Sequence, residues 1–116
     1  MLTLDQAQID TIQQTRRERL ILKLDQWLTA ELPIWMSQPG DVRHGVLSEI
    51  VDVGTEADLQ SEADFALLAR LLAEMGETRQ AFLAHPRVTE VLDWDVRNPG
   101  AKLRELYRLA ETGPET

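Results

Sequence analysis

Residues 61–76 read SEADFALLARLLAEMG, and this stretch decides the predicted fold because it is the densest apolar run in the chain. Its large apolar side chains recur at steps of three and four residues, which places them on one face of a helix. Ser61 and Asp64 have the spacing of a helix N-cap, and Gly76 is a natural helix end. We therefore predict a central core helix here. Its inner face consists of Phe65, Leu68, Leu72 and Met75, with Leu67 and Leu71 beside it.

A long helix is predicted before this segment, over residues 5–32. Thr3 and Gln6 have capping-box spacing at its start, and Pro33 ends it because proline lacks the backbone N–H. Such a helix is roughly 40 Å long, which exceeds the width of a small domain, so we expect one end to protrude or bend. Its predicted apolar stripe consists of Ile9, Ile12, Leu20, Leu24, Trp27 and Leu28.

Proline and glycine also divide the rest of the chain into helices. A second helix is predicted over residues 41–53, with Gly54 as a left-handed C-terminal residue. Shorter helices are predicted over residues 77–84 and 86–94, and a last helix opens at Asn98-Pro99 and closes at Gly113. Leu103, Leu106, Tyr107 and Ala110 form the predicted inner face of this last helix.

Strand signals are nearly absent, since no stretch alternates at period two over more than a few residues. We therefore predict an all-α fold, a single-domain orthogonal bundle of four to five helices with a long N-terminal helix. The domain spans residues 1–116, with a core of about 5–111 and a frayed tail over 112–116.

The chain has 116 residues, no cysteine and a net charge of −8. It shows no secretory signal and no apolar run near the roughly 20 residues of a membrane helix, so we expect a cytoplasmic protein that avoids membranes. The acidity is concentrated in residues 25–64, where Arg43 is the only arginine or lysine. Such a field repels nucleic acid and attracts a basic partner. The acids are Asp25, Glu31, Asp41, Glu49, Asp52, Glu56, Asp58, Glu62 and Asp64.

The sequence carries no recognisable catalytic or metal-binding motif. Neither His44 nor His85 belongs to a zinc-binding pattern, and structural roles are expected for both. The acids from Asp52 onward do not fit a calcium loop, because Gly54 falls at the third position and the loop needs glycine at the sixth. With no phosphate loop and no nucleophile elbow, we predict no enzyme, no cofactor and no metal.

One basic cluster stands out in the first predicted helix. It can pair with the acidic middle of the same chain, or it can indicate nucleic-acid binding. A helix-turn-helix drawn from the second and third helices would open its recognition segment with the acids of residues 56–64, which have the wrong sign for phosphates. We therefore predict no nucleic-acid partner. The cluster consists of Arg16, Arg17, Arg19 and Lys23.

The three tryptophans have different contexts. Trp27 belongs to the stripe of the first helix and is expected in the core. Trp35 lies with Ile34 and Met36 between two prolines. This loop either folds back as a lid on the core or exposes an apolar anchor for a partner, since Trp and Met are favoured at interfaces. Trp94 is open to the same two interpretations, and the sequence does not decide which tryptophan is exposed.

Two neighbouring surfaces are thus candidates for binding another protein: the acidic stretch and the loop around Trp35. We expect charge reversal at Glu56 and Asp58, or Trp35→Ala, to weaken a partner complex and leave the helical content intact. The candidate partner-binding residues are Ile34, Trp35, Met36, Asp41, Glu49, Asp52, Glu56 and Asp58.

Degenerate elements over about residues 5–110 resemble a group of small helical proteins encoded beside type VI secretion effectors and spike proteins in Gram-negative bacteria. The second helix departs from that group because it lacks an aromatic-glycine ending, and extra residues precede Phe82. The resemblance rests on Gln8 in a long polar-apolar helix, Leu32-Pro33 at the end of that helix, residues 61–65, Met75-Gly76, residues 82–86, Val91-Leu92 and residues 103–107.

The resemblance implies a cytoplasmic accessory protein with no catalytic residues. Such a protein binds a secreted effector or spike component as an adaptor or chaperone; the alternative is an immunity protein that neutralises a sibling toxin. A homodimer built on the long first helix is compatible with both roles.

Overall fold

The computed structural model describes residues 6–113, apart from the side chains of residues 7, 9 and 10, and every element in this range is helical. The predicted all-α fold is therefore confirmed. The elements are α1 (Gln6–Glu31), η1 (Pro33–Ser37), α2 (Gly40–Glu56), α3 (Glu62–Met75), η2 (Gly76–Thr78), α4 (Arg79–Ala84), α5 (Pro86–Leu92) and α6 (Gly100–Thr112). None of the helices over residues 6–113 combines the length and the apolarity needed to cross a membrane.

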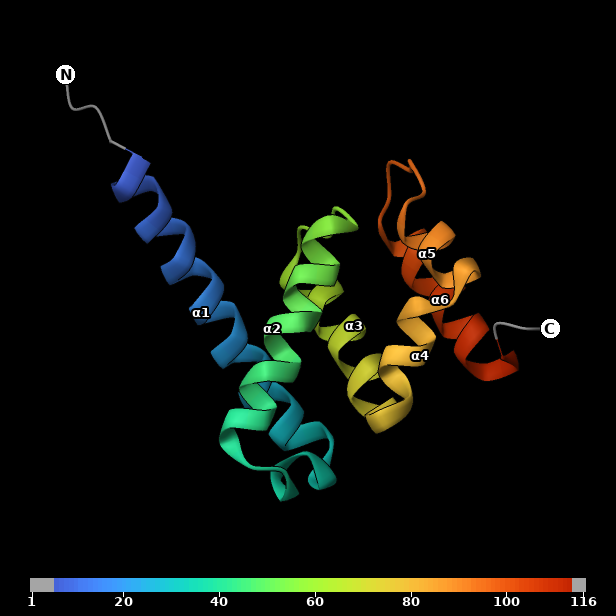
Figure 1. Cartoon of the computed structure of the whole chain (residues 1–116), viewed down its shortest axis with the longest axis horizontal. Coiled ribbons are helices and arrows are strands. Elements are labelled where there is room, and N and C mark those ends of the chain that lie inside the picture. The colour runs from blue at the N-terminus through green and yellow to red at the C-terminus, as the bar shows by residue number, and fades with distance from the viewer. Residues whose placement is uncertain (1–5, 114–116) are drawn as a thin grey trace.

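The long helix α1 packs only along its C-terminal half. Ile21, Leu24 and Leu28 are buried there at three- and four-residue steps, whereas the N-terminal half projects away from the body (Figure 1). The expected protrusion is confirmed, but Ile12 does not belong to a buried stripe, because its side chain is 41% exposed. Apart from Ile12, the described side chains of residues 6–17 are polar, so they form no apolar face that could be buried. Thr3, the predicted capping residue, lies outside the described residues.

Ion pairs between the first three helices show how they run. Arg17 pairs with Asp52 and Arg43 with Asp25, so α1 and α2 are antiparallel. Lys23 pairs with Glu62, and Arg70 with Glu31 on the same two helices, so α1 and α3 are parallel. These helices enclose one side of the core.

The second helix is longer than predicted, and Gly54 lies inside it. A β-carbon at this position would lie 2.5 Å from Cε1 of Phe65, so glycine lets α2 and α3 approach closely. The left-handed residue that follows the helix is instead Asp58, at φ 65°. The prediction of Gly54 as a helix end is wrong, because this position needs a glycine for the space that Phe65 occupies and not for a left-handed backbone conformation.

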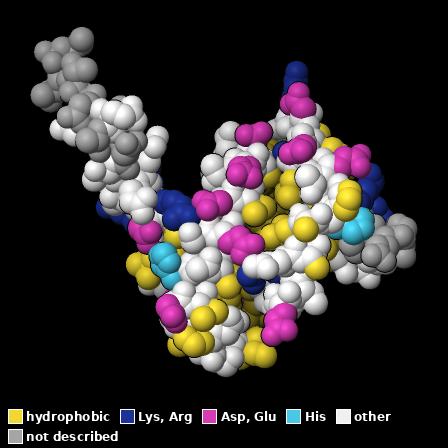
Figure 2. All heavy atoms as spheres, viewed as in Figure 1, with side chains coloured by type: hydrophobic (Ala, Val, Ile, Leu, Met, Phe, Trp, Pro, Cys, Tyr) yellow, Lys and Arg dark blue, Asp and Glu magenta, His cyan; other side chains and the backbone are white. Residues whose placement is uncertain are grey.

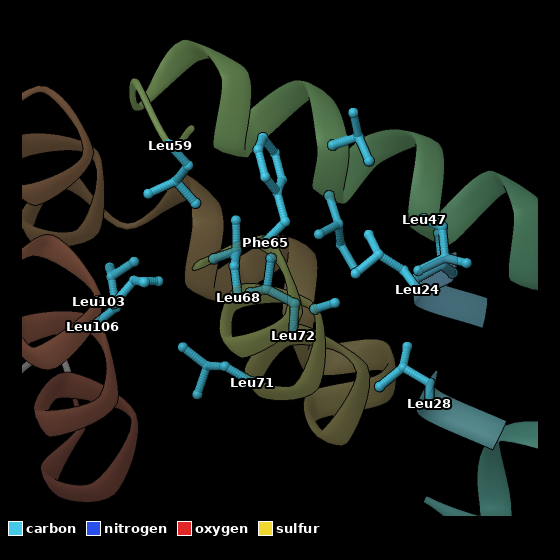
Figure 3. Close-up of a cluster of buried hydrophobic side chains, with 14 of the residues drawn as sticks. Leu24, Leu28, Leu47, Leu59, Phe65, Leu68, Leu71, Leu72, Leu103 and Leu106 are labelled. Atoms are coloured by element: carbon cyan, nitrogen blue, oxygen red, sulfur yellow. The ribbon is translucent and has the colours of Figure 1, made fainter. Parts of the chain in front are cut away.

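The third helix is the centre of the core, as its sequence predicts. The Ser61 hydroxyl accepts a hydrogen bond from the Asp64 N–H at 3.1 Å, and Gly76 ends the helix at φ 57°. Figure 3 shows Leu71 on the side of Leu103 and Leu106, whereas Leu72 lies on the side of Leu28. α3 therefore separates two layers, α1 and α2 on one side and α6 on the other.

The last two helices begin at the predicted residues, next to Pro86 and Pro99. Nδ1 of His85 accepts the Arg87 N–H at 3.1 Å, which confirms a structural role for this histidine at the start of α5. Asn98 accepts the Gly100 N–H at 2.9 Å, and Gly113 closes α6 at φ 86°. Because α6 includes Thr112, the predicted frayed tail begins too early; residues 114–116 lie outside the described range.

A buried lysine joins three helices. Lys102 of α6 is 3% exposed, and its Nζ donates hydrogen bonds to the carbonyl oxygens of Ala57 at 2.9 Å and Leu92 at 2.8 Å. These carbonyls lie at the C-terminal ends of α2 and α5, where the helix dipole favours a positive charge. The inner face of α6 is correspondingly rotated from the predicted one. Its buried members are Lys102, Leu103, Leu106 and Leu109.

Candidate partner-binding surface

Acidic side chains follow the exposed face of α2. Figure 2 shows acidic side chains in a row along this part of the molecule. The α2 members recur at helical spacing on the side opposite the buried Val46, Leu47 and Ile50, and Asp58 follows just after the helix. We call these five residues the acidic face. They are Asp41, Glu49, Asp52, Glu56 and Asp58.

Two members of the acidic face are paired within the chain. Asp52 accepts from Arg17 Nη2 at 3.0 Å, and Glu49 accepts from Arg79 Nη2 at 3.2 Å. Asp41, Glu56 and Asp58 make no ion pair with any residue in the described range. The structure thus brings the predicted acids together and leaves three of them with uncompensated charge.

The basic cluster of α1 is divided in the same way. Arg17 and Lys23 pair with Asp52 and Glu62, so the interpretation that this cluster pairs with the acidic middle is confirmed for these two residues. Arg16 and Arg19 are exposed and form no ion pair with the residues that the structure describes.

Trp35 is buried, so the interpretation of an exposed anchor is wrong and that of a lid on the core is confirmed. Its side chain is 1% exposed, and Nε1 donates a hydrogen bond to Asp25 Oδ1 at 2.8 Å. The same carboxylate oxygen lies 3.3 Å from Arg43 Nε. The tryptophan thus satisfies its polar atom while its ring packs inside, as buried tryptophans usually do. Trp35→Ala would remove part of the core and cannot test binding alone.

The neighbours of Trp35 point outward. Ile34 is 74% exposed and Met36 is 50% exposed, because residues next to a buried position on a short helix face away from the core. The Met36 sulfur lies 3.3 Å from Thr29 Oγ1 and 3.3 Å from Arg43 Nη1, which holds this side chain in place. We call Ile34 and Met36 the apolar pair. Figure 2 shows hydrophobic side chains gathered at the end of the molecule where η1 lies.

The clefts of the surface are open and mostly apolar. One, of about 550 Å³, lies between η1, α2 and the start of α4 and is lined by Trp35, Val42, Val46 and Arg79. The Nε of Arg79 is buried there without a hydrogen-bond acceptor. Another, of about 570 Å³, lies between α3 and α6 beside Tyr107. Glu77 and Arg79 are the charged residues of the first cleft, whereas Arg70, Glu74 and Glu111 line the second together with Tyr107.

No group of three or more metal-ligating side chains gathers among the described residues. His44 instead lies with Nε2 3.1 Å from Glu18 Oε2, on the surface between α1 and α2. Trp94 is partly exposed and packs against the core, so it is neither a free anchor nor a fully buried side chain.

Shifted pKa values occur in α6, away from the acidic face. Burial raises the pKa of Tyr107, whose hydroxyl donates to the Leu67 carbonyl at 2.8 Å. A hydrogen bond from Arg108 lowers the pKa of Glu105, and the charge of Arg87 lowers it further. These shifts come from contacts within α6 and from its packing against α3 and α5.

Comparison with protein-family models, with curated proteins and with solved structures finds no match to this chain. The predicted acids lie along one face, whereas the roles of the buried Lys102 and of Arg79 were not predicted. The signal for Lys102 is a lone lysine one helical turn before Leu106 and two before Leu109, on the face that becomes buried.

Proposed function

We propose that this protein is a non-enzymatic binding module that docks another protein on the acidic face and the apolar pair. The observation that carries the proposal is the way η1 is held. Trp35 fixes this segment from inside through Asp25, while Ile34 and Met36 stay exposed on its surface. Large apolar side chains that are exposed on an ordered segment are typical of contact sites for proteins.

The two parts of the surface have different physical roles in this proposal. The apolar pair supplies contact area, and little conformational freedom is lost on binding because η1 is already ordered. The acidic face supplies orientation and speeds association with a basic partner, because the uncompensated charges of Asp41, Glu56 and Asp58 act over several ångströms.

The partner we propose is a type VI secretion effector or spike component, for which the protein serves as an adaptor or chaperone. The resemblance over about residues 5–110 supports this choice. The alternative is an immunity protein for a sibling toxin. It is supported by the acidic face, which would complement a basic toxin.

The test is co-expression with the products of the adjacent genes, followed by purification on a tag and a titration of the complex. Ile34→Ser with Met36→Ser should weaken the complex by about tenfold or more, as expected for the loss of apolar anchors. Val96→Ser is the matched control, since Val96 is an exposed apolar residue on the loop before α6. Equal affinities for the double variant and the control would show that the apolar pair takes no part in binding.

Deletion of the gene separates the two roles. Loss of an adaptor should abolish secretion of the partner without harming the cell. Loss of an immunity protein should make the cell sensitive to its own toxin. An unchanged phenotype in both assays would argue against both roles.

A further inference from the structure

The projecting half of α1 presents a stripe that no residue in the described part of the chain covers. Ile12, Arg16 and Arg19 follow one another at steps of four and three residues, so they share one side of the helix. All three side chains are exposed, and the two arginines form no ion pair with the described residues. We call these three residues the basic arm.

The basic arm cannot reach the acidic face of its own chain. Arg17 is the residue that points to α2, where it contacts Asp52. Each residue turns a helix by about 100°, so Arg16 and Arg19 lie roughly 100° and 160° away from Arg17 around the helix. The helix is anchored in the core by Ile21 and Leu24 and cannot rotate to bring these arginines inward.

We propose that the basic arm docks on the acidic face of a second copy of this chain. The two surfaces are complementary in charge: in a chain of net charge −8, the arm holds two positive charges and the acidic face three negative ones that form no ion pair within the described residues. The proposed contacts of Arg16 and Arg19 are Glu56 and Asp58, two of these acids, which lie together at the C-terminal end of α2. A two-fold axis would form the contact twice.

The expected dimer is weak. Ile12 to Arg19 span about 10 Å along the helix, so the contact area is small and lies below the roughly 1,200 Å² at which stable specific interfaces begin, in the range of transient encounters. Because much of the attraction is between exposed charges, it decreases strongly with salt. This self-association is separate from the proposed function, and the second copy would occupy the surface that a partner protein needs.

The test uses the purified full chain alone, by analytical ultracentrifugation at up to about 200 µM in about 50 mM and about 500 mM NaCl. The average mass should rise above 13.2 kDa with concentration in low salt and return toward it in high salt. Arg16→Glu with Arg19→Glu should weaken the dimer at least about tenfold. Arg97→Glu with Arg104→Glu is the control, because both of these arginines are exposed and outside the arm.

A charge exchange makes the test specific. Glu56→Arg with Asp58→Arg should also abolish the dimer. Mixing this variant with the Arg16→Glu, Arg19→Glu variant should restore a dimer, because both of its contacts are then between opposite charges. Circular dichroism would verify that each variant keeps its helices. A monomer at every concentration, or a failure of the mixed variants to associate, would overturn the proposal whatever the outcome with a heterologous partner.

Discussion

Replacing Lys102 by methionine should strongly destabilise the fold. The ammonium of Lys102 donates to the carbonyls of Ala57 and Leu92, and it is 3% exposed. Methionine keeps the length and most of the apolar volume of the side chain but removes the charge and both donors. The change therefore isolates the polar contribution from the packing contribution.

The magnitude follows from the two carbonyls left behind. The Ala57 carbonyl lies in a buried bond and loses its donor, which costs about 1–3 kcal/mol. The Leu92 carbonyl is only partly buried, so water can replace the lysine and the cost is about 1 kcal/mol. The total is about 2–4 kcal/mol, or a decrease in Tm of roughly 10–20 °C for a domain of this size. The ammonium's own desolvation cost acts in the opposite direction and is reduced by the two helix C-termini.

The assay is urea unfolding followed by circular dichroism, with Lys23→Met as the control. Lys23 is the only other lysine and makes an exposed ion pair with Glu62, so its replacement should change stability by less than about 1 kcal/mol. If Lys102→Met proved as stable as the unmodified protein, or more stable, the desolvation of the ammonium would outweigh its two hydrogen bonds and the reasoning would be refuted.

Two further predictions concern single residues. Gly54→Ala should destabilise the protein by about 1–3 kcal/mol, because its β-carbon would collide with the Phe65 ring. Gly45→Ala should be neutral or stabilising, since a β-carbon there would meet no atom within 4 Å beyond its own stretch of helix; urea unfolding of both variants checks this. Tyr107, the only tyrosine, should titrate above its ordinary pKa of 10.0 in an absorbance titration. The folded state holds this proton more tightly than the unfolded state does. The contribution of Tyr107 to folding stability is therefore complete below pH 10 and is lost as the pH rises through the folded pKa. A pKa at or below 10.0 would contradict the effect of burial.

Local signals predicted most of the helices. The cap at Ser61 and the stop at Gly76 depend on residues within one turn, and both are found in the structure. Gly54 was misread because its function depends on Phe65, which belongs to the next helix. A glycine that permits a left-handed turn and a glycine that permits close packing look the same in one sequence.

The negative charge of the candidate surface was predicted from the sequence, but the ion pairs that neutralise two of its acids were not. The sign of the acidic stretch follows from composition, whereas the ion pairs of Glu49 and Asp52 depend on arginines distant in the sequence. Trp35 is a similar case, since its hydrogen bond to Asp25 comes from the preceding helix. From the sequence, Trp35 could either cover the core as a lid or stand exposed as an anchor for a partner. In the structure it covers the core, and the exposed side chains are those of its neighbours Ile34 and Met36.

The central position of α3 has a consequence for how this chain folds. One side of α3 contacts α1 and α2 and the other contacts α6, so neither the residues before it nor those after it can complete a core without it. Leu71 packs on the side of α6 and Leu72 on the side of α1 and α2. Because both belong to the same helix, we expect the loss of either side chain to destabilise the packing on both sides of α3. The molecule should therefore unfold in a single cooperative step, and the slowest-exchanging amides of both layers should become labelled at the same denaturant concentration.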